Sequence, residues 1–212
     1  MRLTIFGATG GTGTQLVRQA LEEGHDVRAV VRDPARLDVP AHERLEVLTA
    51  DVRDPVATAP AVEGADAVLS ALGPRGRGPT TICSDGARAI VEAMDKAGVR
   101  RLLVVSAAGP FTDAGDSAVI RYVIKPIILE RLMKDAFDDM RRCEDEVQAS
   151  ELDWTIIRPP QLVDKDATGR YRTATDLNLR GGRKISRADL AACMLGLVAD
   201  ESSVHHRVSV AY

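Results

Sequence analysis

The sequence predicts a single α/β domain built on a doubly wound parallel sheet with helices on both faces. Short apolar runs of β type alternate along the chain with longer helical patterns, which is the order that builds a parallel sheet with crossover helices. A glycine-rich turn follows the first apolar run and opens the first helical stretch. The chain has 212 residues, of which 45% are hydrophobic, so it is long enough and apolar enough for one large core.

Seven runs have the composition of buried strands. They are rich in Val, Ile and Leu, and each is separated from the next segment of the chain by polar residues, Gly or Pro. The predicted strands cover residues 3–6, 25–31, 45–48, 67–70, 101–106, 154–157 and 208–210. Pro159 and Pro160 end the sixth strand because proline cannot donate a backbone hydrogen bond to a sheet.

The segments between these strands carry helical patterns. The predicted helices cover residues 15–21, 54–62, 80–97, 127–149 and 187–198, of which the second is a short crossover. In the third helix, Ile82, Ile90 and Met94 lie on one apolar stripe. Ser186 is the expected N-cap of the last helix, and Asp189 stands at the capping-box position.

The glycine motif of residues 7–13 predicts a dinucleotide site of the Rossmann type. Gly7 permits a tight turn off the strand, Gly10 lets backbone N–H groups approach a phosphate, and Gly13 lets the helix pack closely. The helix N-terminus offers unpaired N–H groups and the positive end of its dipole to the anion. A glycine-rich surface turn is the alternative, but the flanking strand and helix favour the cofactor site. The expected cofactor-binding residues here are Gly7, Thr9, Gly10, Gly11, Thr12 and Gly13.

The end of the second strand predicts NADP(H) rather than NAD(H) as the cofactor. An NAD-specific site usually presents a carboxylate to the ribose 2′-hydroxyl at this point. This chain has Arg32 there, followed directly by Asp33, and Arg36 lies four positions after Arg32. Two guanidinium groups on one short turn suit a 2′-phosphate. The alternative is that both arginines are ordinary solvated loop residues.

Ligands of such sheets bind beyond the carboxyl ends of the strands. Residues directly past four strands are therefore expected to bind the cofactor: Asp51 and Val52 near the adenine; Ala71, Leu72 and Gly73 near the ribose and pyrophosphate; Ser106 near the nicotinamide; and Pro159. The substrate lobe is expected to come from residues of about 107–142 and 161–183 of the single domain, 1–212.

Composition argues against several classes of function. A net charge of −3 and a pI of about 5.8 give no electrostatic reason to expect nucleic acid or an anionic membrane as a partner. We expect a cytoplasmic protein, because the first strand begins next to Met1 and no apolar run has the length of a membrane helix. The three cysteines and four histidines lack the spacing of ligands, so no metal site is expected.

Motifs along nearly the whole chain resemble the biliverdin reductase B family, also called flavin reductase (NADPH), an atypical short-chain dehydrogenase group similar to NmrA-like proteins. The matching segments are Ile5–Gly10, Val31–Asp33, Arg36–Leu37, Gly73, Pro79–Thr81, Gly86–Arg88, Pro159–Pro160, Ile185–Ser186 and Asp189–Leu190. The resemblance implies NADPH binding and hydride delivery to a planar small molecule such as FMN, FAD or a linear tetrapyrrole. It also implies that Thr9, Thr12, Arg32 and Arg36 contact the cofactor, that Ser106 lies near the nicotinamide, and that the protein is a monomer.

One departure from the family concerns the substrate. This chain has Gln161 where the vertebrate enzyme has a histidine after the proline pair. Glutamine orients a ligand by hydrogen bonds but supplies no proton at neutral pH, which favours flavin reduction over tetrapyrrole reduction. Flavin reduction needs mainly the positioning of two ring systems, with protons from solvent.

Tyr122 and Lys125 offer a different route to acid catalysis, since they resemble the Tyr-xxx-Lys pair of short-chain dehydrogenases with one residue fewer between them. Pro126 disfavours helical geometry at Lys125, which argues against the pair. Two alternatives to a planar-acceptor reductase remain open. The first is a non-catalytic NADP(H)-sensing regulator of NmrA-like type, and the second is a small-carbonyl or sugar dehydrogenase or epimerase that works through Tyr122.

Overall fold

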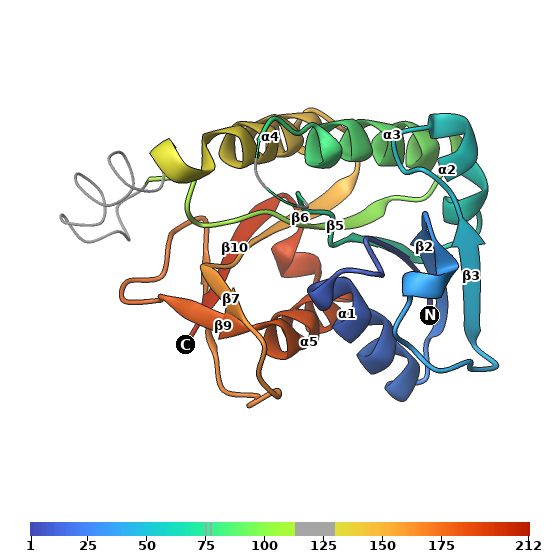
Figure 1. The fold of residues 1–212 in the computed structure, drawn as a ribbon, viewed down its shortest axis with the longest axis horizontal. Coiled ribbons are helices and arrows are strands. Elements are labelled where there is room, and N and C mark those ends of the chain that lie inside the picture. Colours follow the sequence, from blue (N-terminus) through green and yellow to red (C-terminus); the bar gives the residue numbers. More distant parts are fainter. Residues whose placement is uncertain (75, 77, 113–129) are drawn as a thin grey trace.

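An eight-stranded sheet crosses the middle of the molecule, with α2, α3 and α4 on one face and α1 and α5 on the other (Figure 1). The structure is a computed structural model that describes residues 1–74, 76, 78–112 and 130–212. The strand order is β3-β2-β1-β4-β5-β6-β10-β8. The first seven strands in this order run parallel, and β8 is antiparallel to β10. The predicted doubly wound sheet is thus confirmed, with one antiparallel strand at its edge.

All seven predicted strands are present. The strands are β1 (Arg2–Phe6), β2 (Asp26–Val31), β3 (Leu45–Thr49), β4 (Ala67–Ser70), β5 (Arg101–Val105), β6 (Asp153–Arg158), β7 (Gln161–Val163), β8 (Arg172–Thr175), β9 (Lys184–Ser186) and β10 (His206–Ala211). The strands β7, β8 and β9 were not predicted. They are short, and β8 and β9 are largely polar, so they lack the apolar run that marks the others. β7 and β9 pair with each other in a separate small sheet.

The predicted helices are also present. They are α1 (Gly11–Glu22), α2 (Pro55–Val62), α3 (Ile82–Ala97), α4 (Glu130–Gln148) and α5 (Arg187–Val198), with 3-10 turns η1 (Pro34–Arg36) and η3 (Glu201–Ser203). α1 begins four residues before the predicted start, because the glycines assigned to the turn form its first helical turn. Residues 127–129 of the predicted fourth helix lie outside the described residues.

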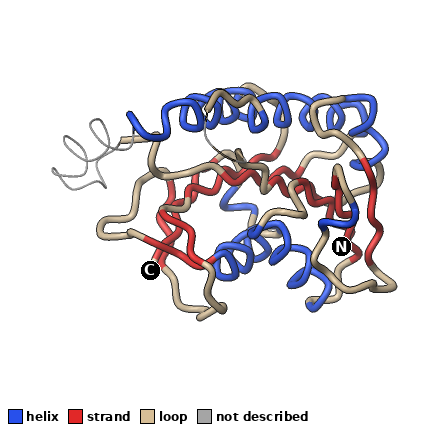
Figure 2. The backbone as a smooth tube through the Cα atoms, in the orientation of Figure 1, coloured by secondary structure: helices blue, strands red, loops and turns tan. Residues whose placement is uncertain are grey.

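Figure 2 shows the sheet between two layers of helices. A hydrophobic cluster lies on each side of the sheet. Alternate residues of the strands enter the two clusters because neighbouring side chains of a strand point to opposite faces. In β5, for example, Leu103 packs toward α1 and α5, whereas Leu102 and Val104 pack toward α2, α3 and α4. Burial of both faces explains why the central strands read as continuous apolar runs.

The N-terminus of α5 holds residues 161–183 against the domain. Ser186 caps the helix as predicted, accepting a hydrogen bond of 2.9 Å from the Asp189 backbone N–H. The predicted capping box is incomplete, because the Ser186 N–H donates to the Tyr212 hydroxyl instead of to Asp189. The buried Asp189 carboxylate accepts hydrogen bonds from Thr168, Gly169 and Tyr212. Burial raises the pKa of Asp189, but these hydrogen bonds outweigh it and lower the pKa overall.

The cysteines are packing residues in this fold. Cys83, Cys143 and Cys193 are buried, and burial raises the pKa of the Cys83 thiol to about 12 and that of Cys193 to about 11. Within the described ranges, no group of three or more His, Cys, Asp or Glu residues is arranged to hold a metal ion. No helix in that part of the chain is long and apolar enough to cross a membrane.

Candidate cofactor-binding site

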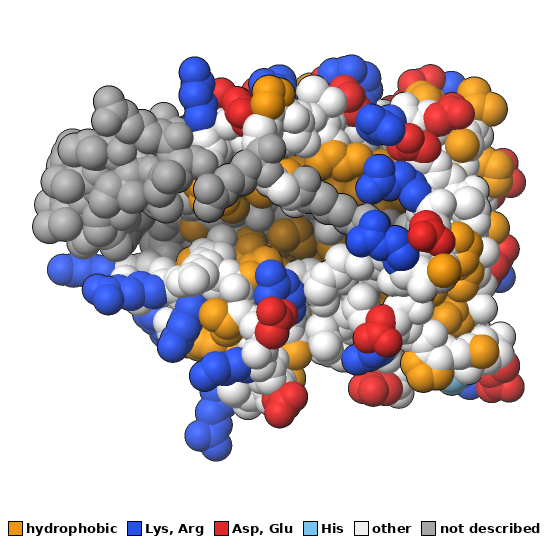
Figure 3. All heavy atoms as spheres, in the orientation of Figure 1, with side chains coloured by type: hydrophobic (Ala, Val, Ile, Leu, Met, Phe, Trp, Pro, Cys, Tyr) orange, Lys and Arg blue, Asp and Glu red, His pale blue; other side chains and the backbone are white. Residues whose placement is uncertain are grey.

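A pocket opens beyond the carboxyl ends of β1, β2 and β4. In the strand order, β2 and β3 lie on one side of β1, and β4 lies on the other side. The order therefore reverses at β1, and ligands of such sheets bind at this switch point. Figure 3 shows a hollow in this face of the molecule, with hydrophobic side chains at its bottom. The pocket is lined by Phe6, Gly7, Thr9, Gly10, Val30, Val31, Arg32, Ala50, Val52, Ala71, Leu72, Gly73 and Ile82.

The glycine turn has the geometry that its motif predicts. Gly7 has φ = +76°, and a Cβ placed on it would lie 2.6 Å from the Ala71 carbonyl oxygen. A Cβ on Gly13 would lie 2.1 Å from the Gly7 carbonyl oxygen, so the first turn of α1 packs directly on the turn that leaves β1. α1 has no acidic residue in its first turn and no side-chain cap at Gly10, so its N-terminal N–H groups suit an anion.

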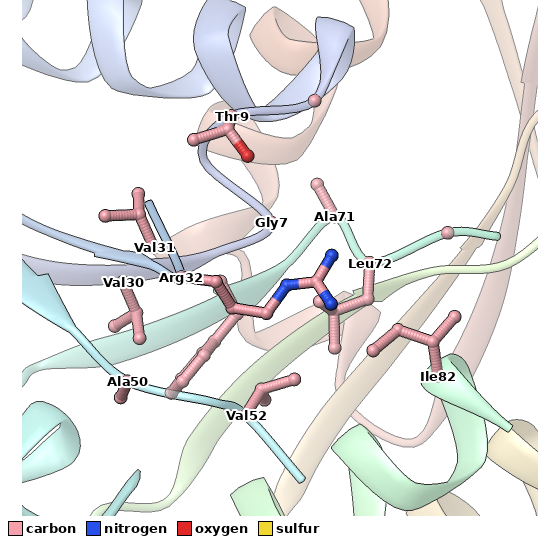
Figure 4. Close-up of a pocket in the computed structure, with 13 residues that line it drawn as sticks. Gly7, Thr9, Val30, Val31, Arg32, Ala50, Val52, Ala71, Leu72 and Ile82 are labelled. Carbon is pink, nitrogen blue, oxygen red and sulfur yellow. The ribbon is translucent and has the colours of Figure 1, made fainter. Parts of the chain in front are cut away.

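Arg32 extends into the pocket, whereas Arg36 does not line it. In Figure 4 the guanidinium group of Arg32 reaches across the pocket toward Ala71 and Leu72. Its exposed side chain makes no hydrogen bond or ion pair with the described part of the chain, so its five donors are available to a ligand. Arg36 is exposed in η1, where the Asp33 carboxylate caps the turn through the Ala35 N–H. The cofactor role of Arg36 stays a prediction.

Val52 lines this pocket, and Asp51, next to it in the chain, is held by hydrogen bonds from Arg53. The two Asp51 carboxylate oxygens accept hydrogen bonds of 3.1 and 2.6 Å from the Arg53 guanidinium. These hydrogen bonds, with a smaller contribution from the charge of Arg32, lower the pKa of Asp51 to about 2. Asp51 is therefore ionised throughout the neutral pH range, and it would accept hydrogen bonds there.

Ser106 follows β5 at the same edge of the sheet. Its backbone N–H donates to the Ile157 carbonyl oxygen at 2.8 Å. Ser70 of β4 pairs with Val104 of β5, which places Ser106 level with Leu72 of the pocket. Ser106 is 4% exposed, and its hydroxyl has no hydrogen-bond partner among the described residues. A buried hydroxyl without a partner is costly in a folded protein, so this group is a candidate for contact with a ligand.

The other predicted residues lie around this edge or away from it. Pro159 is buried past β6, and its carbonyl oxygen accepts a hydrogen bond from the Ala108 N–H at 2.9 Å. Gln161 is exposed in β7, and neither it nor Pro159 lines the pocket. Gly11 is exposed at the start of α1, and Thr12 is buried in its first turn. Tyr122 and Lys125 lie outside the described residues. The roles assigned to these side chains stay predictions.

The loop after β5 packs against side chains of α4 and β6. The Arg158 guanidinium donates to both carboxylate oxygens of Glu144, at 3.0 and 2.5 Å, in a pair that is almost fully buried. The same guanidinium lies 3.6 Å from the centre of the Phe111 ring. Phe137 of α4 packs so closely beneath Gly109 that a Cβ there would lie 2.6 Å from its ring. The loop that begins at Ser106 is thus held on a rigid base.

Five residues of the pocket were not predicted from the sequence, namely Phe6, Val30, Val31, Ala50 and Ile82. Phe6, Val30 and Val31 are the last residues of β1 and β2, and Ala50 directly follows β3. The signal that identifies them is position, because the last residues of a parallel strand stand at the edge where ligands bind. Ile82 opens α3 and lines the pocket from the start of that helix (Figure 4).

The observed residues fit a dinucleotide. Gly7 and Gly13 bring the strand, the turn and α1 together without side chains, and nothing lies within 4 Å of the Cβ position at Gly73 on the opposite wall. Arg32 supplies a cation, and the Ser106 hydroxyl, unpaired within the described part of the chain, lies farther along the same edge. A strand, glycine turn and helix at the switch point of a doubly wound sheet define a dinucleotide-binding protein of the Rossmann type.

A family model described as NAD(P)H-binding matches residues 7–201, and the chain belongs to this family. The doubly wound sheet and the glycine turn at its switch point agree with this family. YhfK of Bacillus subtilis, described as an uncharacterized sugar epimerase, is 29% identical and aligns with 98% of this chain and 92% of its own length.

Two solved structures share the fold. ChuY of Escherichia coli O157:H7, described as an anaerobillin reductase, has a TM-score of 0.82 at 24% identity, covering 100% of this chain and 97% of ChuY. A short-chain dehydrogenase/reductase of Veillonella parvula, solved in complex with NADP, has a TM-score of 0.80 at 19% identity, covering 100% of this chain and 94% of that protein.

Proposed function

We propose that this protein is an NADPH-dependent reductase that delivers hydride to a flavin or a similar planar acceptor. The observation that carries the proposal is the buried hydroxyl of Ser106, which has no hydrogen-bond partner among the described residues and lies level with the cofactor pocket. The residues after it, from Ala107 to Phe111, are small or apolar, a composition that suits contact with a flat ring system. Residues 107–142 and 161–183 form the substrate lobe in this proposal.

The side chains beyond the carboxyl ends of the parallel strands are suited to positioning the cofactor and the acceptor. Bound NADPH would supply the hydride. Arg32 would hold the ribose 2′-phosphate, the N-terminus of α1 would hold the pyrophosphate, and Ser106 would hydrogen-bond the nicotinamide or the acceptor. Ser106 and Gln161 orient ligands but donate no proton at neutral pH, so the acceptor would take its proton from water. A flavin meets this requirement, because its reduction depends mainly on alignment of the two rings.

The direct test is the loss of NADPH absorbance with excess FMN in air, beside the same assay with NADH and without protein. We expect turnover above the uncatalysed rate, and faster turnover with NADPH than with NADH. Saturable NADPH binding without turnover of FMN or FAD would contradict the reductase proposal. It would favour the NADP(H) sensor, or a carbonyl or sugar substrate such as the name of YhfK suggests.

Ser106→Ala provides a matched arm of this experiment, with Ser84→Ala as its control. Both serines are buried, but the Ser84 hydroxyl donates to the Asp139 carboxylate at 2.6 Å. Loss of that charge-assisted bond is expected to cost about 1.5–3 kcal/mol of unfolding free energy. Ser106→Ala removes an unpaired hydroxyl, so we expect unchanged or slightly higher stability and at least about 10-fold lower turnover, the equivalent of one lost hydrogen bond in the transition state. A large loss of stability at Ser106 with unchanged turnover would assign it a structural role.

Charge reversal at Arg32 is expected to change the cofactor preference. Arg32→Glu removes the cation that we assign to the 2′-phosphate and puts a carboxylate near a ribose hydroxyl. NADPH binding should weaken by about 10- to 100-fold, the range of a lost charge-assisted contact, while NADH binding changes little. Fluorescence titration with each cofactor measures this. Arg36→Ala, in parallel, tests the arginine that does not line the pocket, and equal losses for both cofactors at Arg32 would contradict the assignment.

A further inference from the structure

Arg187 lies against the start of α1, beside the glycine motif. It is the first residue of α5, which packs against α1 below the sheet (Figure 1). A Cβ placed on Gly11 would lie 2.6 Å from Arg187 Cδ and 2.8 Å from its Nε. The arginine stem therefore occupies the space that a side chain at Gly11 would fill. Its guanidinium group is held next to the N-terminal N–H groups of α1.

This position concentrates positive charge. The N-termini of α1 and α5 both carry the positive ends of their helix dipoles, and a cation at such an end is unfavourable without an anion. α1 has no acidic residue in its first turn. The acidic residue in the first turn of α5 is Asp189, which is engaged by Thr168, Gly169 and Tyr212. The local balance of charge thus favours a bound anion.

Arg187 already has one ion-pair partner, Asp164, which competes only weakly with a bound anion. Arg187 Nη1 donates to Asp164 Oδ1 at 2.6 Å, and the Asp164 side chain is 87% exposed while that of Arg187 is 29% exposed. Exposed ion pairs of this kind contribute little to stability. The remaining guanidinium N–H groups of Arg187 make no hydrogen bond within the described residues, so the side chain has donors to spare for a second anion.

We infer that Arg187 binds the pyrophosphate of the cofactor from the side of α5, where its guanidinium lies next to Gly11. The inference rests on NAD(P)H binding and is independent of which acceptor is reduced. Both cofactors carry the pyrophosphate, so Arg187 contributes to affinity for NADPH and NADH alike, whereas Arg32 discriminates between them. Through Asp164, which follows β7, the same guanidinium also connects the cofactor site with residues 161–183.

The test measures binding by fluorescence titration, in the absence of any acceptor, so a failed reductase assay does not affect it. Arg187→Ala is expected to weaken binding of NADPH and of NADH by the same factor, about 10- to 100-fold. Binding of 2′-AMP, which has the 2′-phosphate but no pyrophosphate, is measured by displacement of NADPH and should change less than about twofold, since no charge-assisted contact is lost. Arg32→Glu should give the reverse pattern, with loss of 2′-AMP and NADPH binding and retention of NADH binding.

Asp164→Asn separates a ligand-binding role from a structural one. If the ion pair merely holds residues 161–183 in place, this variant loses as much cofactor affinity as Arg187→Ala. Our inference requires unchanged or tighter binding, because Asp164 competes with the pyrophosphate for the same guanidinium. Arg187→Lys keeps the charge without the planar fork and should fall between Ala and the unaltered protein. Unchanged affinity in Arg187→Ala, or an equal loss in Asp164→Asn, would overturn the inference. Thermal unfolding of each variant shows that it is folded.

Discussion

Gly13→Ala is expected to lower the unfolding free energy by about 2–3 kcal/mol and to abolish cofactor binding, because the added methyl group overpacks a rigid contact. The contact is with backbone: a Cβ there would lie 2.1 Å from the Gly7 carbonyl oxygen and 2.8 Å from Ala8 Cα. No flexible side chain is available to move aside. The start of α1 must therefore shift away from β1, and the N–H groups that we assign to the pyrophosphate shift with it.

Gly196→Ala is the matched control for this prediction. Gly196 also lies within a helix, α5, but it is exposed and nothing lies within 4 Å of its Cβ position. Alanine has the higher helix propensity, so we expect this variant to gain about 0.5–1 kcal/mol. For a domain of this size each kcal/mol shifts the melting temperature by about 2–4 °C, so the two substitutions should move it in opposite directions. A similar change in both variants would show that the Gly13 contact relaxes freely.

The glycine motif also shows how far the sequence determines the site. The spacing of Gly7, Gly10 and Gly13 predicts the strand, turn and helix because each glycine meets a local steric requirement that is visible in a few consecutive residues. The pocket wall of Ala71, Leu72 and Gly73 was predicted by the rule that ligands bind beyond parallel strands. Local signals and one topological rule were sufficient for this half of the molecule.

Features that depend on contacts between distant segments were not predictable in this way. Arg187 reads in sequence as an ordinary first residue of a capped helix, and only the packing of α5 on α1 brings it to Gly11. The capping box at Ser186 was predicted from local spacing, but Tyr212 takes one of its hydrogen bonds. The lack of a partner for the Ser106 hydroxyl among the residues that the structure describes is likewise a property of the packed structure. Within the described residues, the strands β7 and β9 pair only with each other, and they have no apolar run to mark them.

The buried ion pair of Arg158 and Glu144 is another such feature, and breaking it from one side is expected to have the largest effect on stability. Glu144→Gln leaves the Arg158 guanidinium buried with a neutral partner, and breaking a buried pair from one side costs about 3–5 kcal/mol. Glu146→Gln on the same helix is the matched control, because Glu146 pairs with Arg88 at a surface where the side chains are 34% and 60% exposed. Loss of that exposed pair should cost about 0–1 kcal/mol. Trp154, the single tryptophan, is buried in β6 and reports unfolding by its fluorescence.

The same pair links stability to the proposed chemistry through Phe111. Arg158 stacks on the Phe111 ring at 3.6 Å. Without its carboxylate partner, the charged guanidinium is more stable in water than in the core, and its movement toward solvent would displace Phe111 and the loop after β5. Glu144→Gln should therefore lower FMN turnover, at a temperature where the protein is still folded, whereas Glu146→Gln should not. A double variant, Arg158→Met with Glu144→Leu, removes both charges. It is expected to be much more stable than Glu144→Gln, since apolar replacements of buried pairs are often neutral. Equal stability losses in the two single variants would mean that water reaches Glu144 in solution, and the base that positions Ser106 and Phe111 would then be less rigid than the packing indicates.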